Sequence, residues 1–459
     1  MPSPPPESKT KEMPSAWQGA LAGWEKAALW GFLALVLAFG GVIEMRSAFL
    51  KRRMTDADVF FRAGWAVRQG LDLYTITDTN GWHYNYPPLF AIMMAPLASP
   101  PPGQSTAGML PYRVLVPLWF LLSVGCIWAS VQWLANALER AGPTGRVSPR
   151  FSRRWWALRL WPILLCLMAV GRTLSRGQSN PILLLLLCGM IALLLEGRSF
   201  RAGLCLAGAI CIKIFPAFLV VQPTLRRDWR CLLGVVVGLV CGLVLVPLAV
   251  FGPAGTVACY RQLDHAVLRP SLRLGEDASR ALELTTATHT GSQSFMAILH
   301  NSIHLDRATR PVDASATVRA AHWLVSALVT VITLAAGWRR RRGDAISEAM
   351  FLGAFIVIML PISPICHVHY FIFAIPLVMT LLADAWERHP FPWIGRGYFL
   401  LFAASIAADI AASLPFTDVW LRDLGVPLYA TLALWVAGIV ALRRRARDHR
   451  APRVAMTSA

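Results

Sequence analysis

Apolar segments recur along almost the whole chain, and they restrict the possible fold more than any other feature of the sequence. Ten of them are candidate membrane spans, alone or with flanking residues: 27–45, 111–137, 156–170, 180–196, 231–252, 318–337, 346–364, 368–384, 397–414 and 425–442. A spanning helix needs about 20 predominantly apolar residues. Composition agrees, because 56% of the 459 residues are hydrophobic and only 15% are charged. So few charges could not cover a soluble protein of this size. The sequence therefore predicts an all-α, polytopic integral membrane protein with about ten spanning helices.

Basic residues predict how these spans are oriented. Arginines cluster beside apolar segments at 140–154, 339–342 and 443–450, within a net charge of +19. Loops of this kind are typical of the cytoplasmic side. We therefore expect a protein of the cell (inner) membrane whose large loops, 46–110 and 253–317, lie outside with the active site. The same placement argues against a nucleic-acid partner.

The ends of the chain and one internal segment complete this organisation. Residues 1–25, rich in Pro, Ser and Lys, predict a disordered cytoplasmic tail, and 446–459 predict a second, basic one. Residues 26–445 would form the membrane domain. Segment 203–222 lies between two basic stretches and must enter and leave on one side. Because Lys213 and Pro216 interrupt it, we expect a helical hairpin bent at 212–216.

The nine cysteines give no sign of a metal site or of a disulfide framework. Most lie inside apolar segments, and none forms a Cys-x-x-Cys pair. Small buried hydrophobes are the expected outcome. The sequence also has no aspartate-rich cluster, so we expect neither a metal nor another cofactor.

Polar residues collect in the first outer loop. Asp56, Asp58 and Arg62 lie in or beside an amphipathic stretch, 57–69, which predicts an interfacial helix along the outer membrane face. These carboxylates either pair with neighbouring arginines or supply a general base, since an ionised Asp can accept a hydroxyl proton. The apolar run that follows, 89–98, is too short to span.

Further polar groups interrupt apolar sequence on the same expected side of the membrane. They are Arg172, Arg176, Gln178 and Asn180, then Gln293, and then His367 and His369. Each alone could be structural, but their gathering with the two aspartates favours a shared site. Arginine suits phosphate because it forms bidentate hydrogen bonds. A lysine at an intramembrane break, Lys213, is costly unless it is paired or functional.

Five short motifs, in order along the chain, give the sequence a family resemblance. They are Asp56-Ala57-Asp58-Val59-Phe60-Phe61-Arg62-Ala63 with Gly70, Leu73-Tyr74 and Tyr86-Pro87-Pro88-Leu89; Gly177-Gln178-Ser179-Asn180; Ala202-Gly203 through Ile212-Lys213-x-x-Pro216; Gln293-Ser294; and Ser363-Pro364-Ile365-Cys366-His367-Val368-His369-Tyr370. The set resembles glycosyltransferase family 87, polytopic enzymes of the GT-C class that use polyprenyl-phosphate-linked sugars. In the last motif Cys366, His367 and Tyr370 replace the family's usual Ser, Trp and second His.

The resemblance implies an inverting transfer of a sugar, typically mannose with arabinose as an alternative, from a polyprenyl phosphate to a lipid or glycan acceptor. The family's essential loop aspartate falls on Asp56, with Asp58 as the alternative, and its histidine falls on His369. The departing phosphate would be bound by Arg172, Arg176, Lys213 and His367. Tyr86, Gln178, Asn180 and Gln293 would contact substrate.

Two other classes of function remain open at this point. A transporter or flippase of a lipid-linked sugar would want charges near the bilayer midplane on several helices, and internal repeats. Here the polar residues lie mostly at one face, and no repeat is evident, which favours surface chemistry. A non-catalytic membrane assembly subunit is the third interpretation.

Overall fold

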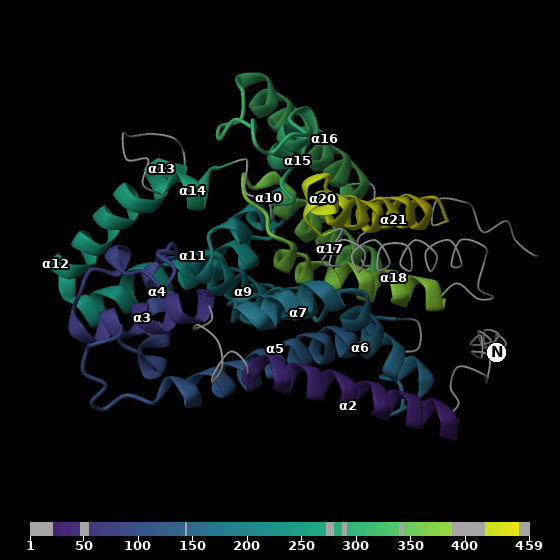
Figure 1. The fold of residues 1–459 in the computed structure, drawn as a ribbon. Helices are drawn as coiled ribbons and strands as arrows, with labels where there is room; N and C mark the ends of the chain where they lie inside the picture. Colours follow the sequence, from purple (N-terminus) through teal and green to yellow (C-terminus); the bar gives the residue numbers. More distant parts are fainter. Residues whose placement is uncertain are drawn as a thin grey trace, which may run out of the picture.

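The computed structural model describes residues 22–45, 55–142, 145–271, 280–286, 292–338, 344–387 and 418–448, and these ranges are mainly helical, without a β-strand (Figure 1). The predicted all-α class is confirmed. Two isolated antiparallel β-bridges occur in these ranges. They pair Thr77 with His83 and Ser292 with His367. The expected span 397–414 and most of both predicted tails lie outside the described residues.

Fewer helices than predicted are suited to crossing a membrane by their length and composition. In the described ranges there are six, or seven if a bent pair counts as one span; the six are Tyr112–Ala141, Trp229–Ser271, Ala316–Trp338, Ala345–Ile362, Val368–Glu387 and Val426–Asp448. The count of ten is not confirmed. One expected span, 180–196, forms α8 (Asn180–Leu195), whose 16 residues fall short of about 20. Helix α9 (Ser199–Ile212), with 14 residues, belongs to the expected hairpin.

The bent pair replaces the single span expected at 156–170. Helix α6 (Arg153–Leu165) and helix α7 (Leu167–Arg176) meet at 65°. The bend carries α7 towards the predicted first outer loop, and Arg172 and Arg176 lie on its last two turns.

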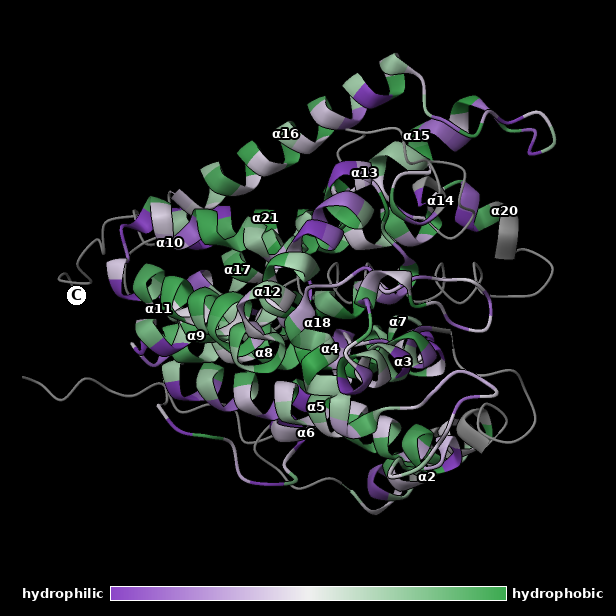
Figure 2. Ribbon diagram, turned by 90° about the vertical axis from the view of Figure 1, so that its left-hand side faces the viewer, coloured by the Kyte–Doolittle hydropathy of each residue, from purple (hydrophilic) through white to green (hydrophobic). Residues whose placement is uncertain are grey.

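Helix α17 (Ala345–Ile362) forms the centre of the bundle. Its residues are buried on every side, as expected for a helix that is apolar all round. Around it lie α5 (Tyr112–Ala141), α8, α16 (Ala316–Trp338), α18 (Ile375–Glu387) and α21 (Val426–Asp448). Helix α2 (Gly23–Met45) packs on α5 and α7. Viewed from the side, hydrophobic residues dominate α8, α9 and α11 (Figure 2).

The predicted hairpin is present. Helix α9 ends at Ile212, Lys213 is extended (φ −139°, ψ 135°), and the chain returns through η4 (Phe215–Val220) and α10 (Val221–Arg226). Ser199 at the start of α9 and Arg226 at the end of α10 line one recess, so the hairpin leaves on the side where it entered. It packs closely on α11 (Trp229–Val240), because a Cβ at Gly203 would collide with the backbone of Cys231.

Helix α11 runs on well beyond the span expected at 231–252. It continues through η5 (Cys241–Leu245), α12 (Val246–Leu263), η6 (Asp264–Leu268) and α13 (Arg269–Ser271). Gly252 interrupts this run with a positive φ of 69°, which a glycine adopts without steric cost. The second outer loop therefore begins as helix rather than as irregular chain.

The first outer loop folds into the protein and does not lie freely along its surface. It contains α3 (Thr55–Gln69), η2 (Leu73–Thr75), α4 (Pro88–Met94) and η3 (Ala95–Leu97). The aromatic ring of Phe60 packs edge-on against Tyr86 and Phe90, and that of Phe61 packs against Tyr112 and Trp119. Helix α3 is thus confirmed as a helix, but protein covers the faces that we expected to meet lipid and water.

Three shorter elements lie on the face that we predict to be the outer one: α14 (Ala281–Leu284), α15 (Phe295–Ile303) and α20 (Asp418–Asp423). A last one, η7 (Val368–Ala374), precedes α18.

Ion pairs hold the opposite end of the bundle. Arg445 of α21 binds Asp344, Asp384 and Glu387, with nitrogen–oxygen distances of 2.7–2.9 Å. Asp344 caps α17, and Asp384 and Glu387 both lie near the end of α18, so one guanidinium joins α17, α18 and α21.

Candidate functional site

An ion pair between the first outer loop and α7 forms the edge of the candidate site. Asp56 lies in the first turn of α3, where the helix dipole favours a negative charge. Its Oδ2 accepts a hydrogen bond from Arg176 Nε at 2.9 Å. The two side chains keep 23% and 40% of their surface exposed. The pair is therefore within reach of a substrate.

Asp58, two residues further on, lies in a closed environment. Its Oδ2 is 2.9 Å from Arg62 Nη2, and the two side chains are only 1% and 5% exposed. Thr79 donates to the same carboxylate oxygen at 3.1 Å, and Arg62 donates to the Thr77 carbonyl at 2.7 Å. Asp58 and Arg62 thus fix loop 77–79 onto α3.

Lys213 lies at the centre of the site, in the break after α9. Its Nζ donates to Gln178 Oε1 at 3.0 Å and to Asn180 Oδ1 at 2.9 Å. The ammonium also lies 5.2 Å from the ring centre of Tyr86 and 4.8 Å from that of Tyr370. Both distances are within the range of cation–π attraction. One buried lysine therefore joins four of the five sequence motifs.

A tight turn between α7 and α8 positions the side-chain amides of Gln178 and Asn180 beside Lys213. Gly177 ends α7 in the left-handed conformation (φ 67°, ψ 38°), which favours glycine. Trp119 of α5 donates to the Gly177 carbonyl at 2.9 Å and fixes the turn. Gln178 follows this turn directly, and Asn180 begins α8. Both side chains are buried, and both accept a hydrogen bond from Lys213.

The two histidines reach the site on η7. The His369 carbonyl accepts hydrogen bonds from Thr173 Oγ1 at 2.9 Å and from Asn180 Nδ2 at 3.2 Å, so its backbone is held by α7 and α8. The rings of His367 and His369 stack with centres 5.2 Å apart. His369 is buried, and its Nε2 has no hydrogen-bond partner within the described ranges. His367 is the more exposed ring.

Positive charge surrounds this pair of rings. Arg172, Arg176 and Lys213 are all close enough to interact electrostatically with His369. Asp56 is within similar reach of Lys213 and of the hydroxyls of Tyr86 and Tyr370. Three cations and one carboxylate gather at one end of the bundle, an arrangement suited to a phosphate.

The Tyr86 hydroxyl stays protonated in this setting. Burial raises its pKa well above the usual value, and the nearby Tyr370 and Asp56 raise it further. It can therefore donate a hydrogen bond to a bound group at neutral pH.

Gln293 lies beside the site, and its side-chain amide forms hydrogen bonds with backbone groups. Its Nε2 donates to the Arg422 carbonyl at 2.8 Å, and its Oε1 accepts from Leu428 N at 3.3 Å. The backbone of Gln293 bonds to Cys366, and Ser292 pairs with His367. The fourth motif therefore supports the histidine segment, and a direct contact of Gln293 with substrate stays a prediction.

No group of three or more His, Cys, Asp or Glu side chains in the described ranges is arranged to hold a metal ion. All nine cysteines are free thiols.

Three residues of the site were not selected from the sequence: Trp119, Thr173 and Tyr370. Thr173 and Trp119 look like ordinary residues of apolar helices, and only the fold shows their hydrogen bonds. Tyr370 was visible as a departure from the family motif. An aromatic ring there fits the lysine that it covers.

The comparisons with known proteins assign the class. Residues 84–364 match glycosyltransferase family 87, which is more than half of the chain. The chain therefore belongs to this family, and the family named from the sequence motifs is confirmed. The match includes Tyr86, Lys213 and Gln293, whereas Asp56 and His369 lie just outside it.

One relative and one solved structure are similar to the chain. The relative is the polyprenol-phosphate-mannose-dependent alpha-(1-2)-phosphatidylinositol mannoside mannosyltransferase of Mycobacterium tuberculosis, 22% identical over 373 residues that cover 79% of this chain and 77% of that protein. The structure is the crystal structure of ArnT from Cupriavidus metallidurans bound to undecaprenyl phosphate. It covers 92% of this chain and 78% of its own, at 17% identity and a TM-score of 0.41, which is too low for structural conclusions.

The protein is a multi-pass membrane glycosyltransferase. Family membership confirms the enzyme class, and the apolar helices confirm the membrane location.

Proposed function

We propose that this protein transfers a sugar, mannose in the first instance, from a polyprenyl phosphate to a lipid or glycan acceptor on the outer face of the membrane. The observation that carries the proposal is the meeting of Asp56 with Arg172, Arg176 and Lys213 around the two histidines. The name of the Mycobacterium tuberculosis relative supports the donor and, less directly, a phosphatidylinositol mannoside as acceptor.

The donor phosphate is assigned to the cationic side of the site. Arg172 and Arg176 lie on successive turns of α7 and face His369 together. Their guanidinium groups can bind two phosphate oxygens each, which a lysine cannot do. Lys213 already donates hydrogen bonds to two amide oxygens. It therefore contributes its positive charge and holds Gln178 and Asn180 in place.

Asp56 is assigned as the general base. The oxygen of the acceptor hydroxyl attacks the anomeric carbon and gives its proton to the Asp56 carboxylate. The bond from the anomeric carbon to the phosphate oxygen breaks, and the electron pair leaves with polyprenyl phosphate. This single displacement inverts the anomeric configuration. Arg172 and Arg176 stabilise the negative charge that develops on the leaving phosphate.

Exposure supports Asp56 over Asp58 in this role. A base must reach the proton that it removes within hydrogen-bond distance. Asp56 is partly open beside the arginines, whereas Asp58 is enclosed by Arg62 and Thr79.

The outer location can be tested by labelling. Gln104 is exposed in the connection between η3 and α5, on the loop that we place outside. In a Gln104→Cys variant, an impermeant maleimide should label intact cells at this position. Labelling only after lysis would place the loop in the cytoplasm.

The reaction itself is tested with purified protein and polyprenyl-phosphate [¹⁴C]mannose. We expect radioactive acceptor and free polyprenyl phosphate to appear in equal amounts. A flippase would move the donor across a vesicle membrane and leave its phosphate–sugar bond intact. Donor movement without polyprenyl phosphate release would therefore overturn the enzyme assignment.

A further inference from the structure

One helical turn of the predicted second outer loop contacts the first loop through two charged side chains. Helix α14 begins directly after Arg280 and contains Glu283 three residues further on, so the two side chains lie on one face of this turn. Arg280 is 5% exposed, and the side chain of Glu283 is 9% exposed. Both charges are therefore enclosed where the two loops meet.

Glu283 binds two residues of the first loop that lie 200 and 198 positions earlier in the chain, His83 and Asn85. Its Oε2 accepts hydrogen bonds from Asn85 Nδ2 at 2.7 Å and from the His83 backbone nitrogen at 3.2 Å. Its Oε1 lies 2.7 Å from His83 Nδ1. Hydrogen bonds to an ionised group are stronger than those between neutral groups. One carboxylate thus fixes the backbone and the side chains of segment 83–85.

Arg280 binds the same segment from the other side. Its Nη1 donates to Asn85 Oδ1 at 3.0 Å, and its Nη2 donates to the carbonyl oxygen of Tyr74. The amide of Asn85 therefore has a cation at its oxygen and an anion at its nitrogen. Both charged side chains of the α14 turn converge on this one residue.

These contacts hold the backbone of Tyr86, a residue of the candidate site. Asn85 directly precedes Tyr86 in the chain. Tyr74, whose carbonyl binds the guanidinium, donates from its hydroxyl to the Tyr86 carbonyl at 3.1 Å. The Tyr86 ring centre lies 5.2 Å from Lys213 Nζ, and its hydroxyl is within electrostatic reach of Asp56. The α14 turn is thus connected to the site by two short routes.

We propose that Arg280 and Glu283 are positioning residues that place the Tyr86 hydroxyl for sugar transfer, an inference that rests on the function proposed above. They act through Asn85 and Tyr74 rather than by touching substrate. A displacement of about 1 Å in a group that contacts substrate can lower a rate by about 100-fold. The second loop therefore helps to build the site from a place remote in sequence.

The placement is tested by ¹⁹F NMR of the purified full-length protein with 3-fluorotyrosine in place of Tyr86, because this fluorine is next to the hydroxyl. We expect one resonance in the otherwise unchanged protein. Glu283→Met and Arg280→Met should shift or split it, and so should Asn85→Ala, which removes both contacts from the side of the first loop. An unchanged resonance in all three variants would overturn the proposal.

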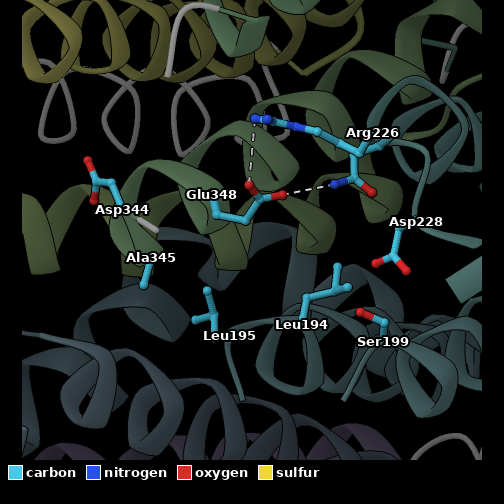
Figure 3. A pocket seen from close by; sticks show the side chains of 9 residues that line it. Leu194, Leu195, Ser199, Arg226, Asp228, Asp344, Ala345 and Glu348 are labelled. Carbon is cyan, nitrogen blue, oxygen red and sulfur yellow. Dashed lines mark hydrogen bonds and ion pairs between the residues drawn. The ribbon is translucent and has the colours of Figure 1, made fainter. Parts of the chain in front are cut away.

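A recess of about 360 Å³ at the opposite end of the bundle supplies the matched control (Figure 3). There Glu348, in the first turn of α17, accepts a hydrogen bond from Gln222 Nε2 at 2.8 Å, so this carboxylate also binds a side-chain amide distant in sequence. At 1.5 Å per residue, α17 separates it from Ile362, next to the last motif, by roughly 20 Å. Glu348→Met should leave the resonance unchanged. A shift as large as that in Glu283→Met would reduce the effect to general destabilisation and overturn the proposal.

A double-variant cycle tests whether the effect on transfer passes through Tyr86. Glu283→Met should lower kcat by about tenfold to 100-fold. In a Tyr86→Phe background the further loss should be about twofold or less, because the hydroxyl that Glu283 places is already gone. A merely structural residue would lower kcat by the same factor in both backgrounds, and that result would overturn the proposal. If the wild type transfers no sugar, the proposed function fails, whereas the ¹⁹F resonance still decides the placement of Tyr86.

Discussion

Helix α3 carries two aspartates, two residues apart, whose surroundings differ in almost every respect. Asp56 pairs across the structure with Arg176 of α7, and both side chains are partly exposed. Asp58 pairs with Arg62 of its own helix, and both are buried. The open pair joins α3 to α7, and either side chain can exchange its partner for a substrate. The closed pair holds a loop and has no room for one. The comparison shows that two carboxylates within a single helical turn can have opposite surroundings, and we infer that only the open one takes part in the proposed chemistry.

The largest expected effect is the loss of turnover when Asp56, the open carboxylate, is neutralised. Asp56→Asn keeps the shape of the side chain but cannot accept the acceptor's proton, so transfer should fall by about 10²–10⁴-fold. The measurement is single-turnover transfer by purified enzyme. Thermal stability should change little because the site is partly open. Activity near that of the wild type would contradict the base assignment.

Asp58→Asn should act on stability instead. Removing the charge leaves Arg62 buried without its counter-ion, and breaking a buried pair costs roughly 3–5 kcal/mol. The measurement is the unfolding midpoint in detergent. The double variant Asp58→Asn/Arg62→Met, which removes both charges, should recover part of the loss. If Asp58→Asn instead loses transfer while remaining as stable as wild type, the roles of the two aspartates are exchanged.

Lys213 sharpens the comparison because it is a buried charge inside the site. Lys213→Met removes the hydrogen bonds to Gln178 and Asn180, so we expect a loss of turnover of about tenfold to 100-fold and a lower midpoint of unfolding. Lys213→Arg keeps the charge but replaces the compact ammonium between the two rings with a larger, planar guanidinium. Its turnover at a matched temperature below both midpoints should therefore stay low, and full activity would show that charge alone suffices.

The two histidines also differ in exposure, because His369 is buried and His367 is the more exposed ring. His369→Ala should lower turnover strongly, while His367→Trp should be tolerated because it restores the residue usual in the family. Stacking of the two rings lets an indole take the place of His367. Turnover is compared for variants of matched stability. Loss only in the His367 variant would assign the role to the more exposed ring.

The smallest predicted effect lies at the far end of the bundle and depends on pH. Although burial alone would raise it, hydrogen bonds from Arg445 and Ser347 hold the pKa of Asp344 at about 2. An unfolded Asp has a pKa near 3.9, so this carboxylate stabilises the fold at higher pH. Its contribution, about 2–3 kcal/mol, should be lost as the pH falls from about 4 to 2. Asp344→Asn should flatten the dependence of the unfolding midpoint over this interval, and an unchanged profile would contradict the assignment.

Much of this arrangement could be predicted from the sequence, because hydropathy and backbone breakers act locally. The apolar runs gave α5, α16, α17 and α21, and Lys213 with Pro216 marked the bent hairpin. Hydropathy could not reveal that α8 is too short to span, or that α12 continues past Gly252 as a helix. It also could not show that α3 is enclosed, since an amphipathic pattern fits a protein surface as well as a membrane surface.

The candidate site, like the fold, could be predicted only in part from the sequence. The motifs indicate Asp56 and His369, and the polar interruptions of apolar sequence indicate Arg176, but neither shows the atoms that each side chain meets. Whether Asp56 or Asp58 faces the arginines depends on the rotation of α3 against α7, which only tertiary packing sets. Lys213 was assigned to the donor phosphate, yet its two amide partners come from α8 and from the turn before it. Contacts between motifs so far apart in sequence leave no local signal.

The anomeric configuration of the product tests the central claim most directly. Transfer from a donor of one defined configuration is followed by NMR of the purified product. A single displacement with Asp56 as base predicts the opposite configuration in every product molecule. Retained configuration, together with a glycosyl group trapped on Asp56, would make this carboxylate a nucleophile and contradict the account.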